Sequence, residues 1–341
     1  MRRTSTEGRR PPRLSSGRRD GLERLEGGID EAGFGPLLGP LCVGYAAFDR
    51  PSEAPDLWSL LARAVAPRPP RAGAPDLPAV CDSKVLYPGA GGFARLERAA
   101  LLFLSLARGG RPATIRGLLE GPFAPSRGDL DAHPWYRDLD LPLPRRAPVE
   151  VLEADLDRAR PVAEGAGVRV RVAGVRVVPE RAFNEGVRRH GNKASFHLDL
   201  VVDLLRHLAT LPRRGEGTIL VDRLGGRRFY RLEALLPEFL PTPLREEPAR
   251  SEYLLHGEAR GARLSFCVGG EHLSFPCALA SVLAKYAREI LVERLNAHFL
   301  ALLPGLRRTA GYFEDGWRFL GDLRRRLAPE EVPLDLLVRL R

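Results

Sequence analysis

The stretch that decides the fold is Gly28–Pro36, which reads GIDEAGFGP and places two adjacent acids directly after an apolar strand start. Neighbouring buried carboxylates are costly unless a cation lies nearby. Successive side chains of a strand point to opposite faces, so Asp30 and Glu31 can serve one site only where the strand ends or bends. Gly33 and Gly35 supply that bend and let a ligand approach the backbone. The alternative interpretation is a solvated glycine turn.

Two more acids stand at the ends of apolar segments. Asp222 ends the short strand expected over residues 218–222, where an acid is either a metal ligand or the cap of a following helix. Glu271 follows the strand expected over residues 263–268 and two glycines. Acids that end neighbouring strands can meet at one edge of a sheet, so these residues are candidate partners of the first pair.

A long helix is expected over residues 276–300. Its alanines and Ser281 are small enough to permit tight packing on a sheet. Ser281, Lys285 and Glu289 recur at four-residue spacing and therefore share one face. A solvated polar stripe is the plain alternative for that face.

The charge of the chain favours a polyanionic partner, because the formal net charge is +10. Fifty of the basic residues are Arg and only three are Lys, which indicates that Lys is kept where a compact ammonium is needed. Residues 1–26 carry eight Arg and four acids among Ser, Pro and Gly, a composition typical of a disordered basic arm.

Taken together, these segments resemble type 2 ribonuclease H (ribonuclease HII). The resemblance rests on five features: the opening motif G-I-D-E-A-G-x-G-P-L-x-G-P at residues 28–40, D-S-K at Asp82-Ser83-Lys84, the strand-ending Asp222, Glu271 ten residues before the serine of A-S-x-L-A-K (280–285), and G-Y at Gly311-Tyr312.

The resemblance implies an α/β fold of the ribonuclease H type. This fold has a mixed five-stranded sheet flanked by helices, with a C-terminal helical extension. The catalytic core is expected over residues 27–109 and 166–300, and the helical extension over 301–341. The proline-rich residues 110–165 are expected to form an insertion or small subdomain on the rim.

The family also implies a metal-dependent endonuclease that cleaves the RNA strand of RNA/DNA hybrids, or ribonucleotides embedded in duplex DNA, leaving 3′-hydroxyl and 5′-phosphate ends. Four carboxylates would hold Mg²⁺, with Mn²⁺ as a substitute and two ions in all. These are Asp30, Glu31, Asp222 and Glu271. The expected nucleic-acid contacts are Gly33, Phe34, Gly35, Lys84, Lys193, Arg223, Ser281, Lys285 and Tyr312.

Two positions depart from the family pattern. Phe34 replaces an arginine, and a phenyl ring can stack on a sugar or base but cannot pair with phosphate. Glu271 replaces an aspartate and adds one methylene, so metal binding should persist with shifted geometry. Two alternatives therefore stay open: a nucleic-acid-binding relative with weak or no catalysis, and a superfamily nuclease that acts on branched DNA.

Other features of the sequence concern its cysteines, its cellular location and its oligomeric state. The four cysteines are unpaired by spacing and are expected to be buried thiols rather than zinc ligands. Neither a secretory signal nor a segment long enough to span a membrane is expected, which favours a cytoplasmic protein without a membrane partner. The oligomeric state is open, with a monomer favoured.

Overall fold

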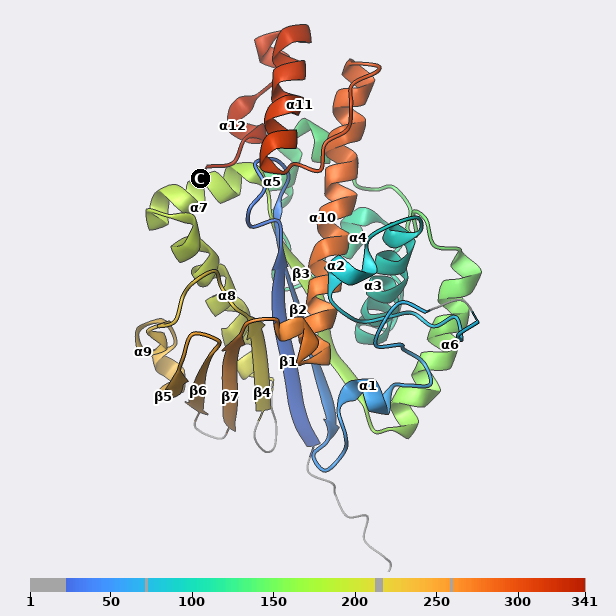
Figure 1. Ribbon diagram of the computed structural model, residues 1–341, viewed down its shortest axis with the longest axis vertical. Helices are drawn as coiled ribbons and strands as arrows, with labels where there is room; N and C mark the ends of the chain where they lie inside the picture. Colours follow the sequence, from blue (N-terminus) through green and yellow to red (C-terminus); the bar gives the residue numbers. More distant parts are fainter. Residues whose placement is uncertain (1–22, 71–72, 212–216, 258–259, 341) are drawn as a thin grey trace, which may run out of the picture.

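The computed structural model describes residues 23–70, 73–211, 217–257 and 260–340. At its centre is a mixed sheet of seven strands in the order β3-β2-β1-β4-β7-β6-β5 (Figure 1). β4 runs parallel to both β1 and β7, and the other neighbours run antiparallel. In chain order the strands are β1 (Glu23–Ala32), β2 (Leu41–Pro51), β3 (Arg169–Val178), β4 (Gly217–Asp222), β5 (Thr242–Glu246), β6 (Arg250–Gly257) and β7 (Arg260–Cys267).

The expected mixed α/β sheet flanked by helices is confirmed, but it has seven strands instead of five. The edge strand β5 contains Pro243, and a proline within a run argues against a strand when only the sequence is known. An edge position tolerates it, because the missing N–H is not needed by a further neighbour. β1 begins at Glu23, so residues 23–26 belong to the sheet and not to the expected basic arm. Residues 1–22 of that arm lie outside the described residues.

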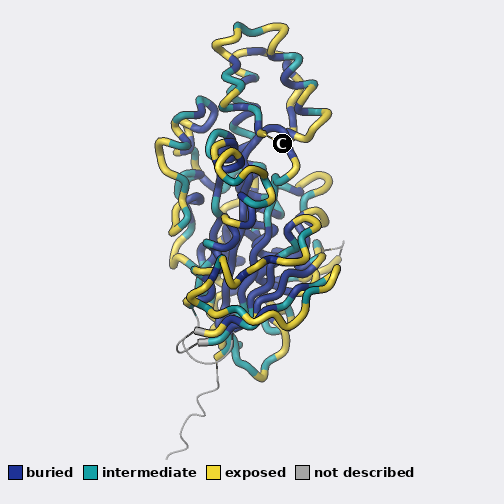
Figure 2. The backbone as a smooth tube through the Cα atoms, turned by 90° about the vertical axis from the view of Figure 1, so that its left-hand side faces the viewer, coloured by how far each residue is buried: buried dark blue, intermediate teal, exposed yellow. Residues whose placement is uncertain are grey.

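Helices cover both faces of the sheet, and the side chains of β2 alternate between two cores. Ala46 and Phe48 join a core with the long helices α3 and α10. Val43 and Ala47 join a second core with α7 and α8. Figure 2 shows buried backbone in the interior and exposed segments along the outside. The longer helices are α3 (Gly92–Arg108), α6 (Val149–Gly165), α7 (Glu180–His190), α8 (Lys193–Ala209), α10 (Phe275–Leu302) and α11 (Phe313–Arg326).

Shorter helices connect these elements. They are α1 (Leu57–Leu60), α2 (Ser83–Leu86), α4 (Ile115–Leu118), α5 (Arg127–Asp131), η1 (Pro134–Tyr136), α9 (Leu232–Leu235), η2 (Pro237–Phe239), η3 (Gly270–His272), η4 (Pro329–Glu331) and α12 (Leu334–Leu337). In the described part of the chain, every helix is too short or too polar to cross a bilayer. All four cysteines are buried, as expected.

Helix α10 lies directly on β1 and β2 because both strands carry glycine beneath it. A Cβ on Gly28 would lie 2.1 Å from the backbone nitrogen of Cys277. A Cβ on Gly44 would lie 2.0 Å from the carbonyl oxygen of Ala280. The expected tight packing of this small-residue helix is thereby confirmed, and it brings Ser281 against the end of β1.

Residues 110–165 contribute to the main core, and their expected place as an insertion or small subdomain on the rim stays a prediction. The buried side chains of Leu118, Trp135, Tyr136 and Leu152 belong to the same core as α3 and α10. That prediction treats prolines as loop signals and names no helix in this segment. Proline is compatible with a helix start, and α6 begins directly after Pro148.

Candidate active site

The ends of neighbouring parallel strands bring the first and third predicted acids together. Ile29 on β1 pairs with Val221 on β4, so Asp30 and Asp222 follow at the same level of the sheet. Adjacent strands lie roughly 4.8 Å apart. Asp222 in turn pairs with Cys267, the last residue of β7. β4 and β7 therefore end at the level of Asp30, while β1 continues for two residues to Ala32.

Glu271 reaches the same edge through the short helix η3. The Gly270 N–H donates a hydrogen bond to Asp222 Oδ1 at 3.0 Å, which ties η3 to the end of β4. Glu271 is buried beside it, with 6% of its surface exposed. We call the four carboxylates of Asp30, Glu31, Asp222 and Glu271 the acidic edge.

The acidic edge is electrostatically unfavourable on its own. Burial, together with the charges of Glu31 and Asp222, raises the pKa of Asp30 well above its ordinary value. Burial and Asp222 raise the pKa of Glu31 to about 8. Burial also raises the pKa of Glu271, with further contributions from Asp222 and Asp82. These carboxyls are therefore close enough to oppose one another's ionisation.

Unpaired oxygens mark the same place. Glu31 Oε2 and Glu271 Oε2 are buried and accept no hydrogen bond from the described residues. A buried carboxylate oxygen without a partner is costly, and a hard divalent cation satisfies such oxygens. The donor set of the acidic edge therefore fits Mg²⁺ or Mn²⁺.

Lys84 supplies positive charge to this edge. Burial lowers its pKa, but the surrounding carboxylates outweigh burial, and the pKa of Lys84 is raised overall. The carboxylates that raise it are those of Asp82, Glu271, Asp30 and Asp222. The Ser83 hydroxyl lies 2.9 Å from that of Ser281, which also hydrogen bonds with Asp30. The D-S-K and A-S-x-L-A-K motifs thus meet beside the first acid.

The four acids do not form one tight ligand cluster. Among the described residues, three metal-ligating atoms come within 4.8 Å of one another in a single group, made of Asp82, Glu271 and His272. Asp82 and His272 were not predicted as site residues. The D-S-K motif was a signal for Asp82, whereas nothing in the sequence marked His272 beyond its place next to Glu271.

Phe34 and Lys193 lie together, and His197 lies between Phe34 and Glu31. The Lys193 ammonium is 4.9 Å from the centre of the Phe34 ring. The centre of the His197 ring is 5.0 Å from the centre of the same Phe34 ring. His197 Nε2 is 3.9 Å from Glu31 Oε2. Burial, aided by Arg339, lowers the pKa of His197 to about 4, so this imidazole is neutral. Sequence reasoning missed His197, whose only signal is its four-residue spacing from Lys193.

Two buried arginines hold residues 33–39, which we call the glycine loop. Arg339, close to the C-terminus, donates from its guanidinium to the carbonyls of Gly33 and Phe34. The Arg288 side chain fills the space beneath Gly33, whose φ of +92° excludes most other residues. The Glu180 carboxylate accepts a hydrogen bond from the Gly39 backbone. We call Arg288, Arg339 and Glu180 the loop clamp.

Tyr312 is presented next to the glycine loop. The Gly311 carbonyl accepts hydrogen bonds from the backbone N–H groups of Leu37 and Leu38. The Arg288 guanidinium lies 5.5 Å from the centre of the Tyr312 ring, and 52% of Tyr312 is exposed. The loop and the tyrosine are therefore parts of one surface.

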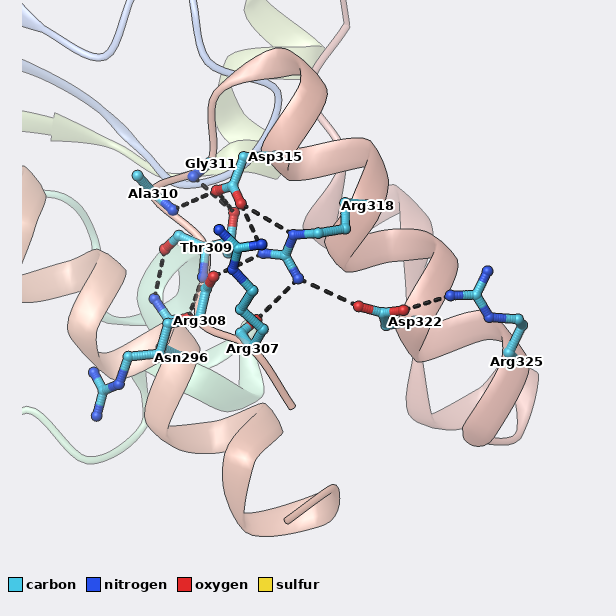
Figure 3. Close-up of polar contacts among 10 residues, drawn as sticks. All are labelled: Asn296, Arg307, Arg308, Thr309, Ala310, Gly311, Asp315, Arg318, Asp322 and Arg325. Atoms are coloured by element: carbon cyan, nitrogen blue, oxygen red, sulfur yellow. Dashed lines mark hydrogen bonds and ion pairs between the residues drawn. The ribbon is translucent and has the colours of Figure 1, made fainter. Parts of the chain in front are cut away.

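A polar network fixes the segment before Tyr312 (Figure 3). Asn296 on α10 accepts from the Thr309 N–H and donates to the Thr309 carbonyl, both at 2.8 Å. Asp315 accepts from the Thr309 hydroxyl at 2.6 Å and from the Ala310 N–H at 2.7 Å. Arg318 pairs with Asp315 at 2.6 Å. The turn between α10 and α11 is thus held on both sides.

The three remaining residues that were predicted to contact nucleic acid have different surroundings from one another. Lys285 pairs with Glu289 at 2.7 Å and covers the Tyr87 ring at 4.6 Å, so it is engaged within the protein. Arg223 folds back to the carbonyl of Arg227 at 2.7 Å. Gly35 is exposed and has open space around it.

Known proteins offer only structural likenesses. No family model matches the sequence, and no match was found among curated proteins. The chain is similar to RNase HII of Archaeoglobus fulgidus, solved in complex with PCNA, at 14% identity and a TM-score of 0.40, covering 93% of this chain and 94% of that one. It is similar to ribonuclease H2 from Pyrococcus horikoshii OT3 at 14% identity and a TM-score of 0.39, covering 92% of each. It is also similar to Bst-RNase HIII in complex with Mn²⁺ at 18% identity and a TM-score of 0.37, covering 99% of this chain and 72% of that one.

Proposed function

We propose that this chain is a metal-dependent endonuclease that hydrolyses the RNA strand of RNA/DNA hybrids, or ribonucleotides embedded in duplex DNA. The observation that carries the proposal is the acidic edge, where carboxyls from separate elements raise one another's pKa and leave buried oxygens unpaired. Hard divalent cations with oxygen ligands relieve that repulsion. β1, β4 and η3 carry these carboxyls, and a bound cation would draw their oxygens closer together.

In this proposal the acidic edge holds Mg²⁺, with Mn²⁺ as a substitute, and two ions in all. Such ions, when bound, activate water and stabilise the charge of the leaving oxygen, so that the products carry 3′-hydroxyl and 5′-phosphate ends. The chain itself orients the carboxylates. The Ser281 hydroxyl holds Asp30, and the Gly270 N–H holds Asp222.

The surroundings of the acidic edge suit a nucleic-acid duplex. Lys84 offers an ammonium group beside the carboxylates, and Tyr312 offers an exposed ring for stacking. The Arg339 guanidinium already donates hydrogen bonds to the carbonyls of Gly33 and Phe34. The backbone around the exposed Gly35 is therefore the part of the loop left to meet a 2′-hydroxyl, the group that distinguishes RNA from DNA.

The test uses three labelled duplexes: one with a single ribonucleotide, a full RNA/DNA hybrid and an all-DNA control. The full chain should nick the first or second in Mg²⁺ or Mn²⁺, and excess EDTA should stop it. Equal cutting of the all-DNA duplex would favour a nuclease for branched DNA. Binding that persists in EDTA, without cleavage in either metal, would favour a catalytically inactive relative.

A further inference from the structure

A second group of ligating atoms lies beside the acidic edge. One ligand atom each from Asp82, Glu271 and His272 lies within 4.8 Å of the others. Metal–ligand bonds of about 2.1 Å would let one ion reach all three after a small adjustment of the side chains. Asp82 caps α2, while Glu271 and His272 are neighbours on η3. The group therefore joins two rigid elements.

Burial distinguishes this group from an ordinary surface cluster. Asp82 is 8% exposed and Glu271 is 6% exposed. Glu271 Oε2 has no hydrogen-bond partner among the described residues. A carboxylate that is buried and incompletely paired is destabilising unless a cation compensates for it. The nearby charge of Lys84 acts on both carboxylates, yet Glu271 Oε2 still has no hydrogen-bond donor among the described residues.

Solvent reaches the group through an open pocket. The pocket has a volume of about 530 Å³, and Asp82, Glu271 and His272 line it together with Trp58, Arg68 and Val85. His272 is exposed, so its imidazole can turn toward an incoming ion. An ion can thus enter without unfolding either element.

We propose that Asp82, Glu271 and His272 form a binding site for a divalent first-row transition ion. One nitrogen and two carboxylate ligands favour Co²⁺ or Zn²⁺ over Mg²⁺, because imidazole is a softer ligand than carboxylate or water. Glu271 also belongs to the acidic edge, so an ion bound here would draw on a proposed catalytic ligand. Only that coupling rests on the proposed nuclease function, since metal binding stands without it.

The experiment is a Co²⁺ titration of the full chain in excess Mg²⁺, followed by visible absorption. We expect His272→Gln and Asp82→Asn each to raise the Kd for Co²⁺ at least about tenfold. Removing a residue that only hydrogen bonds to a metal ligand already weakens metal binding by about that factor. Asparagine caps helices as well as aspartate does, so the Asp82 variant keeps the start of α2. His256→Gln is the matched control. His256 is exposed, and its backbone pairs with Gly261 near the start of β7, whereas the proposed metal site lies beyond Cys267, where β7 ends.

Co²⁺ binding that is equal in the wild type and in the His272 and Asp82 variants would overturn the proposal. Loss of binding in the His256 control together with the other two would overturn it as well, since the effect would then not be local. If the wild type binds Co²⁺ through His272 but nicks no duplex, the metal site stands and the nuclease proposal fails.

Discussion

The acidic edge and the loop clamp are both buried sets of charged groups, yet they are organised in opposite ways. The acidic edge gathers like charges, whereas the loop clamp combines two arginines with one carboxyl. Both sets keep unpaired buried atoms, which are Glu31 Oε2 and Glu271 Oε2 in the acidic edge and Glu180 Oε2, Arg288 Nε and Arg339 Nε in the loop clamp. In the loop clamp, the Arg339 guanidinium donates to backbone carbonyls, and its charge opposes the rise that burial causes in the pKa of the neighbouring Glu180 carboxyl. The first set therefore needs a cation from outside the chain, whereas the second is held by groups within the chain.

The largest expected effect comes from breaking the acidic edge. Asp222→Asn should lower metal-dependent nicking by about a thousandfold or more, because charge complementarity at a reacting centre is worth about that much. Its thermal stability without metal should stay the same or rise, since a like charge is removed from beside Asp30 and Glu31. Initial nicking rates and thermal unfolding in EDTA measure the two effects. A marked loss of stability would mean that this carboxylate supports the fold instead.

The loop clamp carries its own pH dependence. Burial raises the pKa of Glu180 to about 7, although hydrogen bonds from Tyr136 and Gly39 and the charge of Arg339 oppose the rise. A raised pKa means that the folded state holds the proton more tightly than the unfolded state. The contribution of Glu180 is thus fully present below a pH of about 4.5 and is lost as the pH rises to about 7.

Glu180→Gln should remove that loss. Urea unfolding at pH 5 and pH 8 should show the stability of the wild type falling by up to about 3 kcal/mol more than that of the variant, at about 1.4 kcal/mol per pKa unit. Burial lowers the pKa of the neighbouring His133, whose Nε2 lies 3.7 Å from Glu180 Oε2, so the difference between the two proteins reports on this buried pair. If the stability of the wild type and of the variant changed equally with pH, the pKa of Glu180 would not be raised in the folded protein.

A smaller and more local effect is expected from Arg339→Met. The carbonyls of Gly33 and Phe34 would lose their charged donor, which costs about 1.5–3 kcal/mol. The backbone amides of Leu37 and Leu38 should then exchange hydrogen faster. Arg171→Met on β3, which removes a pairing with Asp49 on β2, should leave their exchange unchanged. Unaltered exchange in the Arg339 variant would show that the glycine loop holds its shape without the clamp.

The same contrast explains what the sequence could predict. The acidic edge is visible in the sequence because each acid follows an apolar strand or a glycine turn, and strand ends meet at one edge. The loop clamp is invisible because Arg288 and Arg339 look like any of the other arginines. Arg339 contacts Gly33 across 306 positions of the chain, and no local pattern encodes such a contact.

Local rules also failed where tertiary packing decides the outcome. Prolines concealed α6, although the chain from residue 110 to 165 contributes a fully buried tryptophan and tyrosine to the main core. The nucleic-acid contact expected of Lys285 stays a prediction. The Lys285 ammonium pairs with Glu289, because that residue lies one helical turn further along the same face.

The smallest expected effect separates the two lysines. Lys193 lies over the Phe34 ring beside the acidic edge, whereas Lys285 is already paired with Glu289. If the Lys193 ammonium neutralises one phosphate, Lys193→Gln should reduce the slope of log Kd against log salt by about 0.9. Lys285→Gln, the matched control, should leave the slope unchanged because its charge is internally balanced. Fluorescence anisotropy with a labelled hybrid in Ca²⁺, across a range of salt concentrations, measures both. Equal slopes in the two variants would mean that Phe34, and not a phosphate, is the only partner of the Lys193 charge.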